Sequence, residues 1–502
     1  MNEKDIQNLN LQTQPMVNGD EEIETSTIAP ARAGFTDPAT GNFIPVALPA
    51  TDITMNDGAT VQSRAGQIPD ILENLNAHIQ TSNAHNWRMN PDTGEPEWFN
   101  PVLGGFEGIG RGDNGGDFNP SPAIRTYGVQ VDLNNSNPYT AVSYIDNAVG
   151  MIGGSSMWDS MPIFRDIKPC LFNNGQVVGY LNPNNYGQWD TAYNTAQSIT
   201  PPAGNPNITS GAMGDVMVEF PLAGWQIQTS GNVMTVRITN DPNAGAQGFR
   251  YYAHTRVNEG DRNHLYVGTY KGFILNNRLR SLSGRSPNVS ITIGDLRTAA
   301  RQNGTGYDQQ MFYSITLLQI LYLIRFKNLN SQAALGQGAS GGAGSGLTGP
   351  LVTGTTNSRG LNWGTQNVAN QVKCLGIEDL WGNVWERVDG CFIDANFNLL
   401  TAFQNFNNTG AGYTNRGATG ATATISDWIR RVQGNSEMGF LIREGGGSET
   451  TFFSDWGDIL ASRLGIFGGS WATTVGIAGV SRFHWETAAT VSAVVGGRLM
   501  FL

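Results

Sequence analysis

The sequence is poor in charged residues, in cysteine and in histidine. Only 14% of its 502 residues are charged and the formal net charge is −11, which excludes the basic patch of a nucleic-acid-binding protein. Three cysteines are too few for a disulfide framework. Cys374 and Cys391 flank one motif and are interpreted as free, buried thiols, with a pairing between them as the alternative.

Long apolar runs are missing as well. The longest apolar stretch, 312–326, is interrupted by Ser314, Thr316 and Gln319 and is too short to span a bilayer. The first residues, 1–5, contain no apolar segment of the kind that signal peptides carry. We therefore expect a soluble chain that is made in a cytoplasm and does not insert into a membrane.

Turn-forming residues are abundant instead. The chain has 64 Gly and 22 Pro, and asparagine makes up about a tenth of the residues up to Asn435. Each of these residues favours turns for its own backbone reason, so the composition predicts an α+β, β-rich fold with long loops. Apolar alternation predicts strands, and helical spacing predicts helices. The strands are expected at 127–133, 216–220 and 233–238, and the helices at 295–303 and 309–326.

The most specific segment is 376–386, which reads Gly-Ile-Glu-Asp-Leu-Trp-Gly-Asn-Val-Trp-Glu. Trp381 and Trp385 are four residues apart and can bury large apolar areas. Gly382 and Asn383 can supply the unusual backbone angles of a turn between them. We predict that these four residues are buried scaffold and not ligand contacts. Further scaffold residues are expected near the end of the chain at Gly468, Gly469, Trp471, Gly496, Gly497 and Arg498.

This motif closely resembles the signature of C-type-lectin-like domains of the formylglycine-generating-enzyme type. Segments 467–471 and 495–502 resemble the closing Gly-Gly-Ser-Trp stretch and terminal strand of that family, with Gly497 in place of the usual aromatic residue. A looser similarity to phage tail and fibre proteins that carry this domain extends over 123–502. The resemblance implies a C-type-lectin-like fold at the C-terminus, with the motif in its core.

The last part of the chain has a different composition. Asparagine is absent from 436–502, and within 470–497 the residue types change without a helical or strand pattern. This resembles the variable region of proteins diversified by retroelements, in which mutagenesis of template adenines removes asparagine codons. The resemblance implies a ligand-binding surface of variable residues, and an ordinary loop of a lectin-like fold is the alternative. The positions are Ala472, Thr473, Val475, Ile477, Arg482, His484, Trp485, Glu486, Thr487, Val491 and Ala493.

Physical reasoning adds an expectation about exposure. A segment of such mixed residue types cannot bury one consistent face, and residues that vary freely cannot sit in a close-packed core. Trp485 and Arg482 are the expected binding anchors by residue type. The side chains expected to be exposed on one face are Val475, Ile477, Arg482, His484, Trp485, Glu486, Thr487 and Val491.

Two regions earlier in the chain are interpreted through the same resemblance. Residues 1–43 are polar and lack periodicity, which indicates an arm that becomes ordered against the virion; a flexible terminus is the alternative. Residues 44–122 begin with a β-like segment, 44–48, and are interpreted as an assembly region. Its short apolar seam predicts a homotrimer, and a helix packed on its own domain is the alternative. The seam consists of Ile68, Leu72, Leu75 and Ile79.

Catalysis is not expected. Segment 392–502 has no cysteine, whereas a formylglycine-generating enzyme needs a reactive pair near its C-terminal core, and no two of the five histidines have metal-like spacing. The carboxylates of 378–389 are interpreted as caps of turns. The glycine-rich stretch 333–350 lacks a phosphate-loop ending and is predicted to be a flexible surface loop. We predict no metal, no calcium site and no cofactor.

The sequence therefore predicts a phage virion protein that binds a host receptor, either a protein or a glycan. Residues 123–205 are interpreted as a β-rich lead-in and 206–502 as the receptor-binding domain. The N-terminal arm would contact other virion proteins. A structural decoration protein of the capsid or tail is the alternative, followed by a lectin-fold enzyme.

Overall fold

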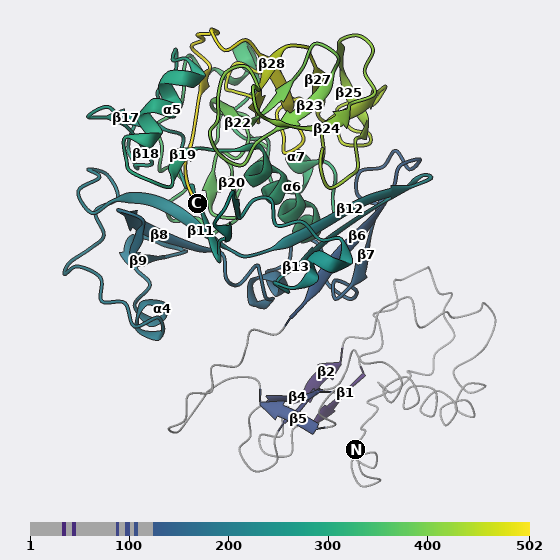
Figure 1. Ribbon diagram of the computed structural model, residues 1–502. Helices are drawn as coiled ribbons and strands as arrows, with labels where there is room; N and C mark the ends of the chain where they lie inside the picture. Colours follow the sequence, from purple (N-terminus) through teal and green to yellow (C-terminus); the bar gives the residue numbers. More distant parts are fainter. Residues whose placement is uncertain (1–32, 37–42, 47–86, 90–95, 101–104, 109–123) are drawn as a thin grey trace, which may run out of the picture. The chain divides into compact units, whose positions relative to one another are not determined.

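The computed structural model describes residues 33–36, 43–46, 87–89, 96–100, 105–108 and 124–502. The chain divides into two units, 1–115 and 116–502 (Figure 1). The described residues of the first unit form two small antiparallel sheets. Their strands are β1 (Ala33–Thr36) with β2 (Phe43–Val46), and β3 (Trp87–Met89), β4 (Pro96–Asn100) and β5 (Gly105–Gly108). β2 agrees with the predicted β-like segment, while the apolar seam of 68–79 lies outside the described residues.

The second unit is β-rich with few helices. Its largest sheet has nine strands. In spatial order these are β24 (Thr414–Ala418), β23 (Asn398–Thr401), β22 (Trp385–Ile393), β28 (Arg463–Phe467), β29 (Phe483–Glu486), β27 (Trp456–Ile459), β25 (Ile425–Val432) and β26 (Ile442–Gly445), with β30 (Val495–Gly496) parallel to β22. The residues 470–497, which show no strand pattern in the sequence, therefore contribute two strands to this sheet.

Two other sheets complete the framework. The seven-stranded sheet runs β10 (Asn185–Trp189), β9 (Gln176–Asn182), β8 (Lys168–Asn173), β11 (Asp215–Pro221), β16 (His264–Gly268), β31 (Leu499–Phe501) and β19 (Tyr307–Gln309). The four-stranded sheet runs β12 (Gly224–Ser230), β13 (Val233–Thr239), β6 (Thr126–Asp132) and β7 (Val142–Asp146). β6, β11 and β13 confirm the three strands predicted from alternation.

The remaining described elements of the second unit are three small hairpins, four α-helices and three 3-10 turns. The hairpins are β14 (Thr255–Arg256) with β15 (Gly260–Asp261), β17 (Phe273–Leu275) with β18 (Arg278–Arg280), and β20 (Lys373–Cys374) with β21 (Ile377–Glu378). The helices are α4 (Thr191–Ala196), α5 (Ile293–Arg301), α6 (Phe312–Phe326) and α7 (Ser331–Ala334), with 3-10 turns at Ser156–Ser160, Ala244–Gln247 and Gly342–Ser345. α5 begins where the Thr292 hydroxyl accepts from the backbone N–H of Asp295 at 3.2 Å.

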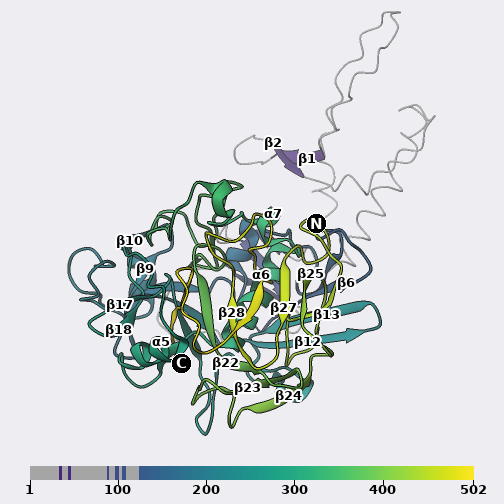
Figure 2. The same cartoon turned by 90° about the horizontal axis from the view of Figure 1, so that it is seen from above.

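Helix α6 is the centre of the unit. Every residue from Phe312 to Phe326 is buried, because the helix lies between the four-stranded sheet and the sheet that contains β22 (Figures 1 and 2). A helix enclosed on both sides needs apolar residues all round rather than on one stripe. The prediction of a helix here is confirmed, with a start three residues later than expected because Tyr307–Gln309 pairs as β19.

The predicted lead-in is not separate from the rest of the second unit. β8 of the lead-in pairs with β11, and β6 pairs with β13, so residues on both sides of 205 share sheets. One hydrophobic cluster extends from Tyr127 to Leu502. The boundary at 205 is therefore not a domain boundary, because hydrogen bonds of continuous sheets cross it.

The three cysteines are free and buried, which confirms the interpretation of Cys374 and Cys391 as thiols. Burial raises the pKa of both thiols, so they stay protonated and unreactive at neutral pH. Over the described ranges, no helix is long and apolar enough to cross a membrane.

Candidate functional site

The motif 381–385 forms a buried support, as predicted. Trp381 is fully buried and its indole N–H donates to the carbonyl of Gly336 at 3.0 Å. Gly382 and Asn383 have φ values of 80° and 59°, which are the left-handed angles expected of these residue types. A Cβ atom on Gly382 would lie 2.8 Å from the carbonyl oxygen of Ala339. Larger residues are therefore excluded at this position by both angle and space.

This support holds the bases of two loops near the end of the chain. The first loop is 471–477 and the second loop is 487–494. The N–H of Trp471 donates to the carbonyl of Asn383 at 2.9 Å, and the N–H of Trp385 donates to the carbonyl of Val494 at 2.9 Å. Because Asn383 and Trp385 are two residues apart, one short stretch of scaffold holds the start of the first loop and the end of the second loop. Figure 1 shows this part of the chain in yellow at the top of the unit, near β28.

The backbone of the first loop is fixed by the glycine-rich stretch. The N–H of Gly341 donates to the carbonyl of Thr473 at 2.6 Å, and the side chain of Gln332 donates to the carbonyl of Gly476 at 2.9 Å. Within this stretch Ala339 and Ser340 are fully buried. The prediction that 333–350 is only a surface loop is therefore wrong in part, since its small residues allow close packing against the motif.

The backbone of the second loop is fixed from the opposite side. The N–H of Ser290, just before α5, donates to the carbonyl of Ser492 at 2.9 Å. The guanidinium of Arg387 donates to the carbonyl of Thr490 at 2.5 Å. Both loops thus have anchored main chains, and their side chains do not contribute these anchoring hydrogen bonds.

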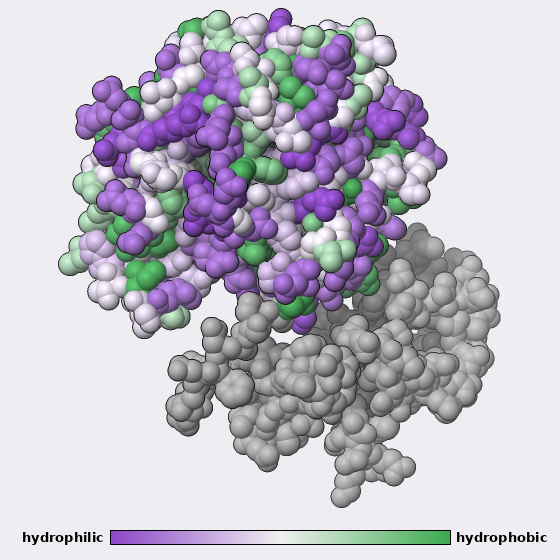
Figure 3. Space-filling model, viewed as in Figure 1, coloured by the Kyte–Doolittle hydropathy of each residue, from purple (hydrophilic) through white to green (hydrophobic). Residues whose placement is uncertain are grey.

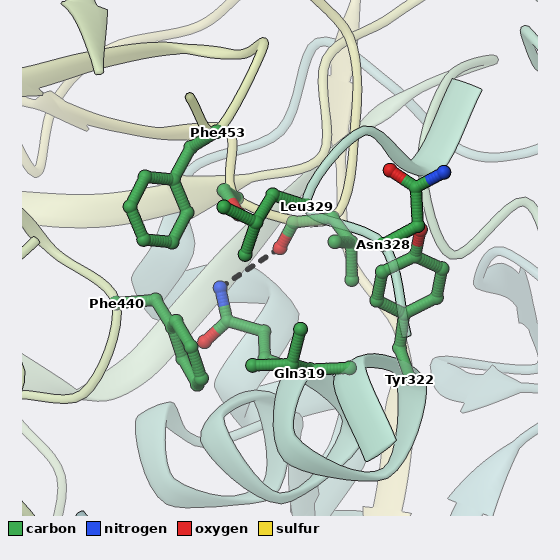
Figure 4. Close-up of a pocket in the computed structure, with 9 residues that line it drawn as sticks. Gln319, Tyr322, Asn328, Leu329, Phe440 and Phe453 are labelled. Carbon is green, nitrogen blue, oxygen red and sulfur yellow. Dashed lines mark hydrogen bonds between the residues drawn. The ribbon is translucent and has the colours of Figure 1, made fainter. Parts of the chain in front are cut away.

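The segment between the loops is part of the core. The amide of Gln319 on α6 donates to the carbonyl of Val480 at 2.8 Å (Figure 4), beside a gap of about 10 Å³ that has room for one water at most. The N–H of Ser481 donates to the carboxylate of Asp455 at 2.8 Å. Burial raises the pKa of Asp455 to about 7. These contacts hold the start of β29 in place.

Strand β29 alternates between the core and the surface. Phe483 and Trp485 point inward and are buried, while His484 and Glu486 are half-buried. The indole N–H of Trp485 donates to the carbonyl of Asp458 at 2.7 Å. The prediction that Trp485 is an exposed binding anchor is therefore wrong. The strand has only four residues, which is too few for its period-2 alternation to be recognised in the sequence.

Arg482 is also buried, so its predicted role as an exposed anchor is wrong. Its guanidinium lies 5.1 Å from the centre of the Trp385 ring and donates to the carboxylate of Asp458 at 2.9 Å. The same carboxylate oxygen is 2.8 Å from Nδ1 of His484. Burial alone would raise the pKa of Asp458, but the hydrogen bond with His484, the charge of Arg482 and the hydrogen bond from Ser426 lower it below its usual value. Asp458 therefore organises the polar face of β29.

The other predicted positions divide by exposure. Thr473 is buried, and its hydroxyl accepts from the N–H of Ser470 at 2.8 Å, so its expected role in ligand contact is corrected to that of a turn-forming residue. Ile477 is half-buried, like His484 and Glu486. The exposed positions are Ala472, Val475, Thr487, Val491 and Ala493.

Three polar atoms beneath this surface have no hydrogen-bond partner in the described part of the chain. They are Nε1 of Trp471, Nε of Arg482 and Oε2 of Glu486. Burial raises the pKa of Glu486, against the opposing charge of Arg387. Unsatisfied buried polar atoms are uncommon in folded proteins. All three atoms are buried, so none of them is open to a ligand from solvent in this structure.

The terminal scaffold residues lie behind this surface. Arg498 is fully buried and donates to the carbonyls of Gly268, Thr269, Glu378 and Asp379 and to the Glu386 carboxylate. A Cβ atom on Gly497 would lie 3.1 Å from the side chain of Leu296 of α5. The Leu296 side chain occupies the room that a larger residue would need. Gly468, Gly469 and Gly496 are buried as well.

Within the described residues, no group of three or more His, Cys, Asp or Glu side chains could hold a metal ion. The sequence analysis missed Asp455 and Asp458, which position β29. Both lie in Ser-Asp-Trp-Gly-Asp (454–458), which runs into β27, and this combination of acidic and aromatic residues was the available signal.

No protein-family model and no curated protein matches the chain. Among solved structures, that of PvdO from Pseudomonas aeruginosa is similar over 60% of this chain and 99% of that chain, with 12% sequence identity and a TM-score of 0.28. A TM-score of this size carries no argument about fold or activity.

Proposed function

We propose that the chain is a phage virion protein whose C-terminal, C-type-lectin-like domain binds a receptor on the host cell surface. The observation that carries the proposal is the construction of the two loops. Their main chains are anchored through Thr473, Gly476, Thr490, Ser492 and Val494. Side chains at the exposed positions can therefore change chemistry without disturbing the fold, which is what a surface for varied receptors requires.

Some of the exposed side chains are apolar, which also suits them to recognition of a partner. Val475 and Val491 are 42% and 55% exposed, and apolar side chains on a surface contribute to binding when a partner covers them. The loss of asparagine after Asn435 supports the same interpretation. Ala472, Val475, Thr487, Val491 and Ala493 would make the contacts, and the half-buried His484 and Glu486 of β29 would contribute polar groups.

Substitution of the exposed loop residues should abolish binding to host cells and leave the fold intact. We would change Val475→Glu, Thr487→Arg and Val491→Glu together in the full chain and measure binding of the labelled protein to host bacteria. Binding should fall at least about tenfold, equivalent to about 1.4 kcal/mol. The midpoint of urea unfolding should stay within about 0.5 kcal/mol, as is usual for surface changes.

The matched control changes three exposed apolar residues elsewhere, Val149→Glu, Ile152→Arg and Val233→Glu. These side chains are 69%, 63% and 40% exposed, and binding to cells should be retained. If the loop variant and the control variant bound host cells equally, or if the unmodified chain did not bind them, the result would instead support a structural decoration protein.

A further inference from the structure

A polar cleft of about 510 Å³ opens on the seven-stranded sheet, with none of its lining residues in either loop. Its walls come from the β8–β9 turn, the β14–β15 hairpin, the start of β16, the loop before β19, and β31. This volume is within the range of about 300–1,000 Å³ typical of sites for small ligands. The cleft is a second candidate binding site in the unit.

One wall of the cleft carries half-exposed aromatic rings. Tyr266 and Phe501 are neighbours across β16 and β31, with ring centres 6.1 Å apart. Buried Phe172 packs against both, at 4.1 Å from Tyr266 and 4.8 Å from Phe501. The hydroxyl of Tyr266 donates to the buried carboxylate of Glu219 at 2.7 Å. The rings are therefore held rigidly, which lowers the entropy lost on binding a flat apolar surface.

The β14–β15 hairpin and the residue that follows it contribute charged groups of both signs to the lining of the cleft. Arg256 and Arg262 both pair with Glu259, and Asp261 accepts from the hydroxyl of Thr255 at 2.7 Å. Two cations face two carboxylates, so these side chains have no excess charge that would select an ion. They still offer several fixed donors and acceptors. His264 adds an exposed ring at the rim.

We propose that this cleft binds a neutral sugar of the pyranose class. A pyranose ring has an apolar C–H face that stacks on aromatic rings, and hydroxyls at its edge that need both donors and acceptors. Tyr266 and Phe501 meet the first requirement, and the Arg262, Glu259 and Asp261 groups meet the second. The cleft is separate from the two loops, so it would supply a second contact with a sugar-coated surface.

The test is binding of four sugars to the full chain by saturation-transfer NMR: the methyl pyranosides of glucose, galactose, mannose and N-acetylglucosamine. At least one should bind the unmodified protein. The variant Asp261→Ala with Arg262→Ala should weaken that binding at least tenfold with an unchanged unfolding midpoint, because both side chains are exposed. The control, Arg430→Ala with Glu444→Ala, removes an exposed ion pair elsewhere and should bind normally.

Several results would overturn the proposal that the cleft binds a sugar. They are no binding by any of the four sugars, equal binding by the Asp261/Arg262 variant, or stronger binding of inorganic phosphate than of any sugar. The loop variant Val475→Glu, Thr487→Arg, Val491→Glu separates the two proposals. It should lose adhesion to cells and keep sugar binding, whereas loss of the sugar signal in that variant alone would place the sugar on the loops and contradict the cleft.

Discussion

Replacing Glu386 by alanine is expected to destabilise the protein by about 3–5 kcal/mol, because it removes the carboxylate that pairs directly with two buried cations. Glu386 is fully buried, and one of its oxygens accepts from Lys271 at 2.7 Å and from Arg498 at 2.6 Å. Burial alone would raise its pKa, but the charges of Arg498 and Lys271 outweigh that effect and lower it. Urea unfolding at pH 7 measures the loss.

The pH dependence of the stability lost in Glu386→Ala identifies the cause of that loss. Burial lowers the pKa of Lys271 to about 8, and Glu386 opposes that shift. Without Glu386 the folded-state pKa falls further below the unfolded value of about 10.4. A folded state that binds fewer protons gains stability as pH rises, so the stability lost in Glu386→Ala should shrink as pH rises from 7 to about 8, the pKa of Lys271 in the unmodified protein, and stay constant above that.

Two further variants serve as controls for Glu386→Ala. Adding Lys271→Met should recover part of the stability, because the unpaired buried ammonium is then gone. Glu444→Ala breaks an exposed pair with Arg430 and should cost about 0–1 kcal/mol. Equal effects of Glu386→Ala and Glu444→Ala would contradict the role assigned to the buried cluster.

The change Trp381→Ala should cost about 3–5 kcal/mol, since a large buried aromatic side chain would leave a cavity. The Trp381 ring is fully buried and packs edge-on against Tyr322 of α6, with ring centres 6.1 Å apart. Its hydrogen bond to Gly336 also holds the stretch that anchors the first loop. The midpoint of urea unfolding, with its slope, gives the measurement.

Two comparisons make the Trp381 prediction specific. Trp381→Phe should cost less, because it keeps most of the apolar area and loses mainly one hydrogen bond. Trp385→Ala should also cost less, since Trp385 is 8% exposed and packs in a small cluster with Ile466 and Val495. An unchanged unfolding midpoint for Trp381→Ala would show that the motif does not belong to the core.

The predictability of the fold followed the strength of the local pattern. Period-2 alternation identified β6, β11 and β13, and apolar helical spacing identified α6. The turn chemistry of Gly382 and Asn383 was readable because only a few residue types adopt left-handed angles. By contrast, β29 has only four residues, and such a strand is specified by its neighbours β28 and β27 rather than by its own pattern.

The same reason explains the errors at the candidate site. Arg482 and Trp485 are residue types that often act as binding anchors. Here Arg482 pairs with Asp458 and stacks on Trp385. Trp485 is buried in the core. Asp458 is 24 residues before Arg482, so the pairing arises from the tertiary fold. Val475 and Val491 were placed correctly on the surface because they lie in loops, where the local sequence determines exposure.

We infer that a fixed scaffold displays a variable recognition surface, and sequencing this gene in independent isolates that carry it is the sharpest test of that inference. Replacements should cluster at Ala472, Val475, Thr487, Val491 and Ala493. Buried Trp381, Arg482 and Trp485 should stay unchanged. Replacements spread evenly along the chain, or as frequent at the buried positions as at the exposed ones, would contradict the account.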